Sequence, residues 1–134
     1  MSVFVDTSAF YALLVQTDAD HEAVATEFRG LVERGRRLAT SNYVVVETTA
    51  ILQNRLGLAP VRDLEEYILP LLNLLWVDRP VHRAAVERLL RTDRRELSLV
   101  DCTSFELMDA GGIRQAFALD EDFEKEGYLL LPRR

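Results

Sequence analysis

Short apolar runs alternate along the chain with longer segments in which apolar residues recur at helical spacing. Residues 2–6 (SVFVD) are rich in β-branched and aromatic side chains and predict a strand. Thr7 and Ser8 follow directly and are good N-caps for a helix. Residues 19–34 again have apolar positions at helical spacing, and Gly35 is a stop signal. The N-terminal part therefore predicts a strand followed by two helices.

The next segment has a pattern that supports two structures. The short apolar run 38–40 predicts a strand, and the β-branched run 44–46 is also typical of one. We nevertheless expect a helix over residues 43–57, capped by Ser41 or Asn42. The reason is that apolar positions continue at helical spacing beyond the β-branched run until a glycine ends the pattern.

The second half continues the alternation of strands and helices. Residues 61–75 predict a helix that Pro70 kinks or ends. The remaining predicted helices are one at residues 81–92 and one that has Asp101 at its start and ends near Gly111 and Gly112. The remaining predicted strands are at residues 75–77, 113–120 and 128–132. Trp76 and most phenylalanines fall on apolar positions, so we expect them in the core.

This order of elements predicts an α/β fold. We expect a mostly parallel central sheet of about five short strands, flanked by helices on both faces. A chain of 134 residues is near the modal size of one domain, so a single domain over residues 1–134 is expected. Open sheets of this kind bind ligands beyond the carboxyl ends of their strands, where strand order reverses.

The composition excludes several functional classes. The chain is 49% apolar and 28% charged, without a long uncharged apolar run, so we expect no membrane insertion. The N-terminus lacks the basic segment of an export signal, and a cytoplasmic location is expected. Cys102 is the single cysteine, which excludes an internal disulfide, and we expect it to be buried in a helix. His21 and His82 are interpreted as exposed or capping residues rather than general bases.

The net charge of −6 argues against tight nucleic-acid binding by global attraction, although local binding stays possible. Nearly all the positive charge is arginine, whose planar fork suits phosphate. The arginine clusters are Arg34, Arg36 and Arg37; Arg88, Arg91, Arg94 and Arg95; and Arg133 with Arg134. We interpret each cluster first as a solvated helix end, with phosphate contact as the alternative.

Four acidic residues stand at expected strand ends or helix starts. Asp6 and Asp120 each end a predicted strand, and if the first and fourth strands are neighbours, both point into one crevice. Asp101, near a helix start, and Glu47, about one turn into a helix, can project into the same place. Glu47 is the most informative because an acid within the apolar run VVVETTAIL is costly if it faces the core unpaired. Taken singly, each acid also has an ordinary interpretation as a cap, turn or surface residue.

Clustered carboxylates point to metal chemistry. They repel one another, so either their pKa values rise or a divalent cation joins them. An all-oxygen pocket suits Mg²⁺ or Mn²⁺ and disfavours zinc, which prefers nitrogen and sulfur ligands. The acidic set therefore predicts a metal-dependent hydrolase.

Four motifs, DTSAF, SNYVVVETT, LSLVDCTSFELM and ALDEDF, together resemble the PIN domain, and in particular the VapC-type toxin ribonucleases of toxin–antitoxin pairs. The resemblance covers essentially the whole chain, in order and at compatible spacing. It implies that Mg²⁺ or Mn²⁺ is held by Asp6, Glu47, Asp101 and Asp120, with Asp122 as an auxiliary ligand. Polar support near the metal or the scissile phosphate would come from Thr7, Ser8, Asn42 and Ser104. One departure is Ala118, which stands where many relatives carry threonine or serine, so we expect one hydrogen bond near the metal to be absent.

The resemblance implies a toxin that cleaves single-stranded RNA as a Mg²⁺- or Mn²⁺-dependent endoribonuclease, leaving 5′-phosphate and 3′-hydroxyl ends. It also implies a homodimer and a small antitoxin, for which the apolar surfaces of residues 11–15 and 43–56 are candidate contacts. One alternative is a catalytically weak PIN-like module that binds RNA or protein, but such a module has no reason to keep a repulsive acidic set. Another is a metal-dependent DNA nuclease, but the short chain lacks insertions that could clamp a DNA junction.

Overall fold

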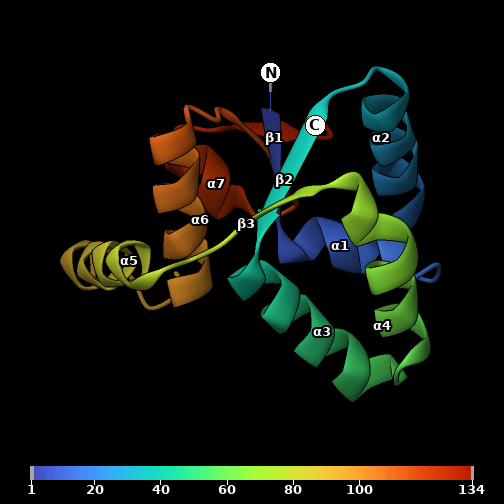
Figure 1. Cartoon of the computed structure of the whole chain (residues 1–134), viewed down its shortest axis with the longest axis horizontal. Coiled ribbons are helices and arrows are strands. Elements are labelled where there is room, and N and C mark those ends of the chain that lie inside the picture. Colours follow the sequence, from blue (N-terminus) through green and yellow to red (C-terminus); the bar gives the residue numbers. More distant parts are fainter. Residues whose placement is uncertain (1, 134) are drawn as a thin grey trace.

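The first strand lies at the centre of a parallel sheet (Figure 1). The computed structural model describes residues 2–133. The strands are β1 (Ser2–Val5), β2 (Arg37–Ser41), β3 (Asn73–Leu75), β4 (Gln115–Phe117) and β5 (Leu129–Leu131). Their order across the sheet is β3-β2-β1-β4-β5, and every neighbouring pair is parallel. The predicted α/β class with a parallel sheet is confirmed.

Strand order reverses at β1, because β2 and β3 follow on one side and β4 and β5 lie on the other. In the β1–β4 register Val5 is the partner of Phe117, so the residues after both strands meet at the carboxyl edge of the sheet. The Asp6 amide continues this contact by donating a 3.0 Å hydrogen bond to the Phe117 carbonyl oxygen. The first and fourth strands are therefore neighbours, as the crevice prediction required.

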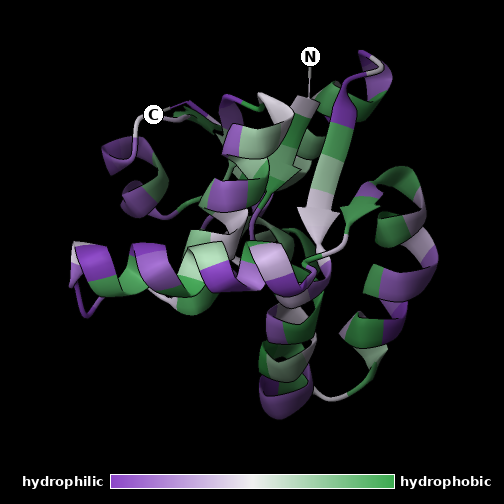
Figure 2. Ribbon diagram, turned by 60° about the vertical axis from the view of Figure 1, so that its left-hand side comes forward, coloured by the Kyte–Doolittle hydropathy of each residue, from purple (hydrophilic) through white to green (hydrophobic). Residues whose placement is uncertain are grey.

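Helices cover both faces of the sheet. They are α1 (Thr7–Leu14), α2 (His21–Glu33), α3 (Asn42–Leu56), α4 (Ala59–Asp63), α5 (Arg79–Thr92), α6 (Leu99–Gly111) and α7 (Glu121–Lys125). In Figure 1, α1 and α2 lie on one side of the central strands, and α5 and α6 lie on the other. Figure 2 shows apolar residues along the central strands and polar ones mainly on outward turns of the helices. Val3, Phe4 and Val5 are all buried, as expected for a strand packed on both faces.

The helix expected over residues 43–57 is confirmed with a slightly earlier start. Ser41 is its N-cap and accepts a 3.1 Å hydrogen bond from the Val44 amide. Val44 is fully buried whereas Val46 is 68% exposed, which is the periodicity of a helix with one buried face. The β-branched run therefore forms helix because tertiary packing outweighs its strand propensity.

The helix predicted over residues 61–75, with a kink or an end at Pro70, does lose its regularity before this proline, but its regular α-helical part is shorter than expected. The α-helical part, α4, ends at Asp63, and a π-helical turn (Leu64–Ile68) and a 3₁₀ turn (Leu69–Leu71) follow. Pro70 lies in the 3₁₀ turn. Its ring removes a backbone donor and clashes with the preceding turn, so an α-helix cannot continue through it.

The buried strand expected at residues 75–77 is wrong in position and in burial. The strand β3 spans Asn73–Leu75 at one edge of the sheet. Leu74 is 44% exposed and Trp76 is 69% exposed, so Trp76 is not a core residue. An edge strand has a partner on one side only, and its apolar side chains therefore need not be covered.

Other parts of the core agree with the sequence pattern. Phe4, Phe10, Phe105 and Phe117 are fully buried, as predicted. Cys102 is buried within α6, also as predicted. Among residues 2–133, the helices are all too short or too polar to traverse a lipid bilayer.

Candidate active site

The acidic residues singled out by the sequence meet in one cavity at the carboxyl edge of the sheet. The cavity has a volume of about 450 Å³. Its lining comprises Asp6, Thr7, Ser8, Tyr11, Asp18, Glu47, Ile51, Arg55, Ser98, Asp101, Leu119 and Asp120. The four predicted metal ligands thus come together from the end of β1, from α3, from α6 and from the segment after β4.

Asp6 enters this cavity directly after β1 and is the N-cap of α1. Its Oδ2 accepts hydrogen bonds from the Ser8 amide at 3.2 Å and from the Ser8 hydroxyl at 2.7 Å. The same hydroxyl accepts a 3.0 Å hydrogen bond from the Leu119 amide. Ser8 therefore joins the carboxylate of Asp6 to the backbone that leads to Asp120.

Glu47 enters the cavity from α3. Its Oε1 accepts a 2.6 Å hydrogen bond from the Thr7 hydroxyl, and the Thr7 oxygen accepts a 3.2 Å hydrogen bond from the Thr48 hydroxyl. These contacts explain how an acid is accommodated within an apolar helical run. It is half-buried, and it has a hydrogen-bond partner.

Asp101 lies in the first turn of α6 and is only 8% exposed. Its Oδ2 accepts a 3.1 Å hydrogen bond from the Ser98 amide, and its own amide donates to the Ser98 hydroxyl at 3.0 Å. This reciprocal pair is a capping box, which fixes the carboxylate at the positive end of the helix dipole. Ser98 thereby orients one acid of the cavity.

Asp120 and Asp122 lie at the start of α7. The Oδ1 of Asp120 accepts a 2.9 Å hydrogen bond from the Asp122 amide. Carboxylate oxygens of Asp101, Asp120 and Asp122 all lie within 4.8 Å of one another. Arg94, in the loop between α5 and α6, donates a 2.7 Å hydrogen bond to Asp122 Oδ1. The charge of Asp122 is therefore balanced by Arg94, whereas Asp101 and Asp120 have no such ion pair among residues 2–133.

The electrostatics of the cavity favour a cation. Burial raises the pKa of the Asp6 carboxyl to about 6, against the hydrogen bonds from Ser8, and the charge of Glu47 adds to the increase. Burial also raises the pKa of Asp101 to about 7, and the charges of Asp6 and Asp120 raise it further. The pKa of Asp120 is raised by burial and by the neighbouring Asp122. The donor set consists of carboxylate oxygens, which suits a hard divalent cation such as Mg²⁺ or Mn²⁺.

Two of the predicted supporting residues do not line this cavity. Asn42 Oδ1 accepts a 2.7 Å hydrogen bond from the Val77 amide and so holds the segment that follows β3. Ser104 is fully buried, and its hydroxyl donates to the Val100 carbonyl oxygen at 3.1 Å. Both side chains thus contact backbone groups outside the cavity, and the support expected from Asn42 and Ser104 stays a prediction. Thr7 and Ser8 do line the cavity and contact the acids.

Several residues that line the cavity lie outside the set predicted from the sequence. Tyr11, Asp18 and Arg55 were not among the candidate site residues, although all three line the cavity. Only the four-residue spacing of Glu47, Ile51 and Arg55 could have pointed to Arg55, because residues at that spacing share one face of a helix.

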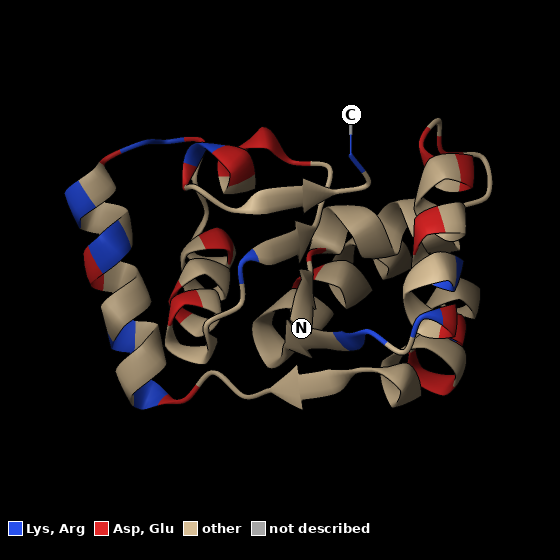
Figure 3. Ribbon diagram, turned by 90° about the horizontal axis from the view of Figure 1, so that it is seen from above, with Lys and Arg blue, Asp and Glu red and all other residues tan. Residues whose placement is uncertain are grey.

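Among residues 2–133, the arginines of the clusters predicted from the sequence do not line the acidic cavity, and some of them form ion pairs with acidic residues. Figure 3 shows basic residues along α5 and in the loop that follows it. Arg88 contacts Glu106 at 2.8 Å, Asp109 at 3.1 Å and Glu126 at 3.4 Å. Within the described chain, Arg94 is the cluster member that contacts a predicted metal ligand.

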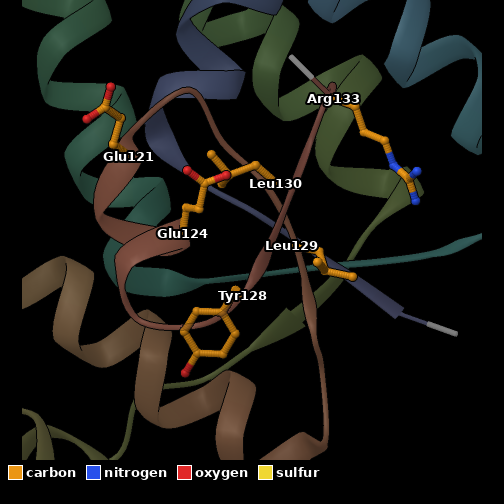
Figure 4. Close-up of a pocket in the computed structure, with 6 residues that line it drawn as sticks. All are labelled: Glu121, Glu124, Tyr128, Leu129, Leu130 and Arg133. Carbon is orange, nitrogen blue, oxygen red and sulfur yellow. The ribbon is translucent and has the colours of Figure 1, made fainter.

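A larger hollow of about 590 Å³ lies at the β5 edge (Figure 4). Its lining residues are Glu121, Glu124, Tyr128, Leu129, Leu130 and Arg133. In Figure 4 the side chains of Glu121 and Arg133 lie on opposite sides and do not converge on a common point. Size alone therefore does not identify the site, and the smaller acidic cavity is the better candidate.

Comparisons with known proteins agree with this geometry. A family model of the PIN domain matches residues 3–127. The chain is 36% identical over 128 residues to the 23S rRNA-specific endonuclease VapC20 of two Mycobacterium tuberculosis strains, covering 95% of each chain. The crystal structure of Mycobacterium tuberculosis VapC20, described as a sarcin-ricin loop cleaving toxin, superposes with a TM-score of 0.83 at 34% identity, over 95% of this chain and 96% of that one.

Two more distant structures share the fold. FitAcB from Neisseria gonorrhoeae has a TM-score of 0.72 at 19% identity, over 97% of this chain and 96% of that one. VapBC2 from Rickettsia felis, bound to a promoter DNA fragment, has a TM-score of 0.72 at 11% identity, over 97% of both chains. The family model matches residues 3–127, and the sheet has β1 at its centre with strand order reversing there. The chain therefore belongs to the PIN-domain family.

Proposed function

We propose that this protein is a toxin of a toxin–antitoxin pair and acts as an endoribonuclease on single-stranded RNA. The observation that carries the proposal is the meeting of Asp6, Glu47, Asp101 and Asp120 in one cavity. The chain's 36% identity to a 23S rRNA-specific endonuclease supports RNA as the substrate, and ribosomal RNA is the first RNA to test.

We propose that these four carboxylates hold a divalent cation, Mg²⁺ or Mn²⁺. Asp122 would be an auxiliary ligand, since its oxygen lies within 4.8 Å of those of Asp101 and Asp120. When bound, the cation supplies charge stabilisation at the phosphate and lowers the pKa of a bound water molecule. The raised pKa values of Asp6 and Asp101 support this assignment, because a cation would stabilise their charged forms.

The protein's own contribution is to position these oxygens before substrate arrives. Thr7 orients Glu47, Ser8 orients Asp6, and Ser98 orients Asp101. Histidine takes no part in this scheme. The ring of His21 contacts the Ala12 carbonyl oxygen at 2.8 Å and that of His82 contacts the Tyr43 hydroxyl at 2.6 Å, and neither residue lines the cavity.

The proposed partners are RNA, a second copy of the chain in a homodimer, and an antitoxin, with the complex in the cytoplasm. For the antitoxin we retain the surfaces of residues 11–15 and 43–56 as candidate contacts. Val46 and Leu56 of the second segment are 68% and 48% exposed, which leaves apolar area for such a contact.

The test is cleavage of a single-stranded RNA and of the matching DNA in Mg²⁺, in Mn²⁺ and in excess chelator. We expect RNA cleavage that needs the cation and leaves 5′-phosphate and 3′-hydroxyl ends. Asp6→Asn should reduce cleavage by more than about 100-fold while circular dichroism shows a folded protein. Glu121→Gln is the matched control, because Glu121 is exposed beside Asp120 but does not line the cavity.

If RNA is cleaved as fast in excess chelator as in Mg²⁺ or Mn²⁺, the metal mechanism is refuted. Faster cleavage of the matching DNA than of the RNA would favour the DNA-nuclease alternative. If Asp6→Asn still inhibits growth in cells, the function would instead be that of a binding module.

A further inference from the structure

A single basic residue lies among the acids of the cavity. Of the described residues that line it, Arg55 alone carries a positive charge, together with the acids Asp6, Asp18, Glu47, Asp101 and Asp120. Yet Arg55 forms no ion pair with any acidic residue among residues 2–133. An exposed arginine that stays unpaired beside so many carboxylates is available for an anionic ligand.

The position of Arg55 is set by an aromatic ring. Its guanidinium carbon lies 5.4 Å from the centroid of the Tyr11 ring, a cation–π contact. This contact holds the side chain against α1. A guanidinium stacked on a ring keeps its N–H groups directed outward, where they can donate to phosphate oxygens.

Arg55 and Tyr11 lie on α3 and α1, the same two helices that carry Glu47 and Thr7. Glu47, Ile51 and Arg55 recur at four-residue spacing on α3 and all line the cavity. On α1, Thr7 and Tyr11 have the same spacing, Thr7 contacts Glu47, and Tyr11 contacts Arg55. Two helical turns separate Glu47 from Arg55, a rise of about 12 Å. This rise along α3 suits contact with a neighbouring phosphate of a strand whose scissile phosphate would lie at the carboxylates.

We propose that Arg55 binds a backbone phosphate of the RNA strand beside the scissile bond and that Tyr11 is its positioning residue. This inference rests on the proposed ribonuclease function and adds a substrate contact to it. The contact gives affinity and register without reading a base, since every nucleotide carries the same phosphate. It also explains how a cavity rich in carboxylates admits a polyanion from one side.

The test compares Arg55→Ala and Arg55→Lys with Arg62→Ala, the matched control. Arg62 is likewise an exposed arginine in the last turn of its helix, but it does not line the cavity. We expect Arg55→Ala to raise the KM for single-stranded RNA about tenfold, with a smaller change in kcat. The slope of log KM against log salt should decrease by about 0.7, the value for one phosphate contact on a single strand. Arg55→Lys should keep the slope, and Arg62→Ala should match the wild-type protein.

Binding gives a second readout that does not need cleavage. In the Asp6→Asn background, fluorescence anisotropy with a labelled single-stranded RNA should show the same loss of affinity for Arg55→Ala and a partial loss for Tyr11→Leu. An unchanged KM, salt slope and affinity in Arg55→Ala would overturn the inference, even if its melting temperature falls. Absence of cleavage by the wild-type protein would instead count against the proposed function, and the binding measurement would still decide the role of Arg55.

Discussion

The hydroxyl of Thr7 donates a 2.6 Å hydrogen bond to Glu47, a residue 40 positions later in the chain. Thr7 directly follows Asp6, whose own carboxylate is held by Ser8. One short segment at the start of α1 therefore positions two of the four acids that line the cavity. The hydroxyl of Thr48 in turn donates a 3.2 Å hydrogen bond to the Thr7 oxygen, so Thr48 supports the residue that orients Glu47.

Replacing this hydroxyl tests its effect on Glu47. Thr7→Val preserves the shape of the side chain but leaves Glu47 without its donor and Thr48 without its acceptor. We expect kcat/KM for RNA to fall by about 10- to 100-fold. The free energy of unfolding should decrease by about 1–2 kcal/mol. Chemical denaturation and steady-state kinetics measure both, with Thr26→Val on the exposed face of α2 as the control. Wild-type kinetics in Thr7→Val would mean that Glu47 does not need this contact.

The stability of the metal-free protein should depend on pH in a defined direction. Asp6 and Asp101 have pKa values of about 6 and 7 in the folded protein, against 3.8 ordinarily. They bind protons more tightly when folded, so their contribution to stability is largest at low pH and is lost as pH rises through both values. In chelator we expect the free energy of unfolding to fall by about 4 kcal/mol between about pH 5 and about pH 8, roughly a third of it from Asp6 and the rest from Asp101.

Thermal melts in chelator and in saturating Mg²⁺ check this prediction. The cation should remove most of the decrease, because it stabilises the charged carboxylates. A stability that rises over this pH range in chelator would contradict the burial of two repelling acids.

Asp101→Asn should stabilise the fold while it removes activity. Asparagine can still accept the hydrogen bond from the Ser98 amide, so the capping box persists while the buried charge is lost. We expect the melting temperature in chelator to rise by about 3–5 °C. Mg²⁺ should then give a smaller further increase than in the wild-type protein. Asp63→Asn, an exposed change in α4, is the control, and an unchanged or lower melting temperature for Asp101→Asn would argue against repulsion in the cavity.

Arg94→Ala tests whether Asp122 is an auxiliary ligand. The variant removes the 2.7 Å ion pair and leaves Asp122 unbalanced beside Asp101 and Asp120. Without metal the melting temperature should therefore fall. The dissociation constant for Mn²⁺, measured by calorimetry, should decrease by roughly three- to tenfold, because a carboxylate becomes free to bind. Arg95→Ala at the exposed neighbouring position is the control, and weaker Mn²⁺ binding in Arg94→Ala would exclude Asp122 as a ligand.

The meeting of the four acids could be predicted because local rules place each of them. Asp6 follows a β-rich run, and Asp101 lies three residues after a good helix cap, so neighbours in the sequence fix both positions. The adjacency of the first and fourth strands then follows from the reversal of strand order in doubly wound sheets.

The residues that were missed depend on packing between distant segments. Arg55 and Tyr11 meet because α1 packs against α3, and no pattern within either helix specifies that contact. The exposed Trp76 was missed for a similar reason, since hydrophobicity does not tell a central strand from an edge strand. Asn42 and Ser104 belong to the site motifs, but their side chains contact the backbone of Val77 and Val100 and do not line the cavity.

The central position of β1 places Asp6, the first of the four cavity acids in the sequence, beside the strand that leads to Asp120, the last of the four. Asp6 is made early in synthesis, yet its partner across the crevice arrives only when β4 has docked against β1 and the turn at residue 120 has formed. A nascent polypeptide lacking that turn has an incomplete ligand set. On the proposed function, the toxin therefore cannot cleave RNA before the β4 segment and the turn at residue 120 have been made and have docked against β1.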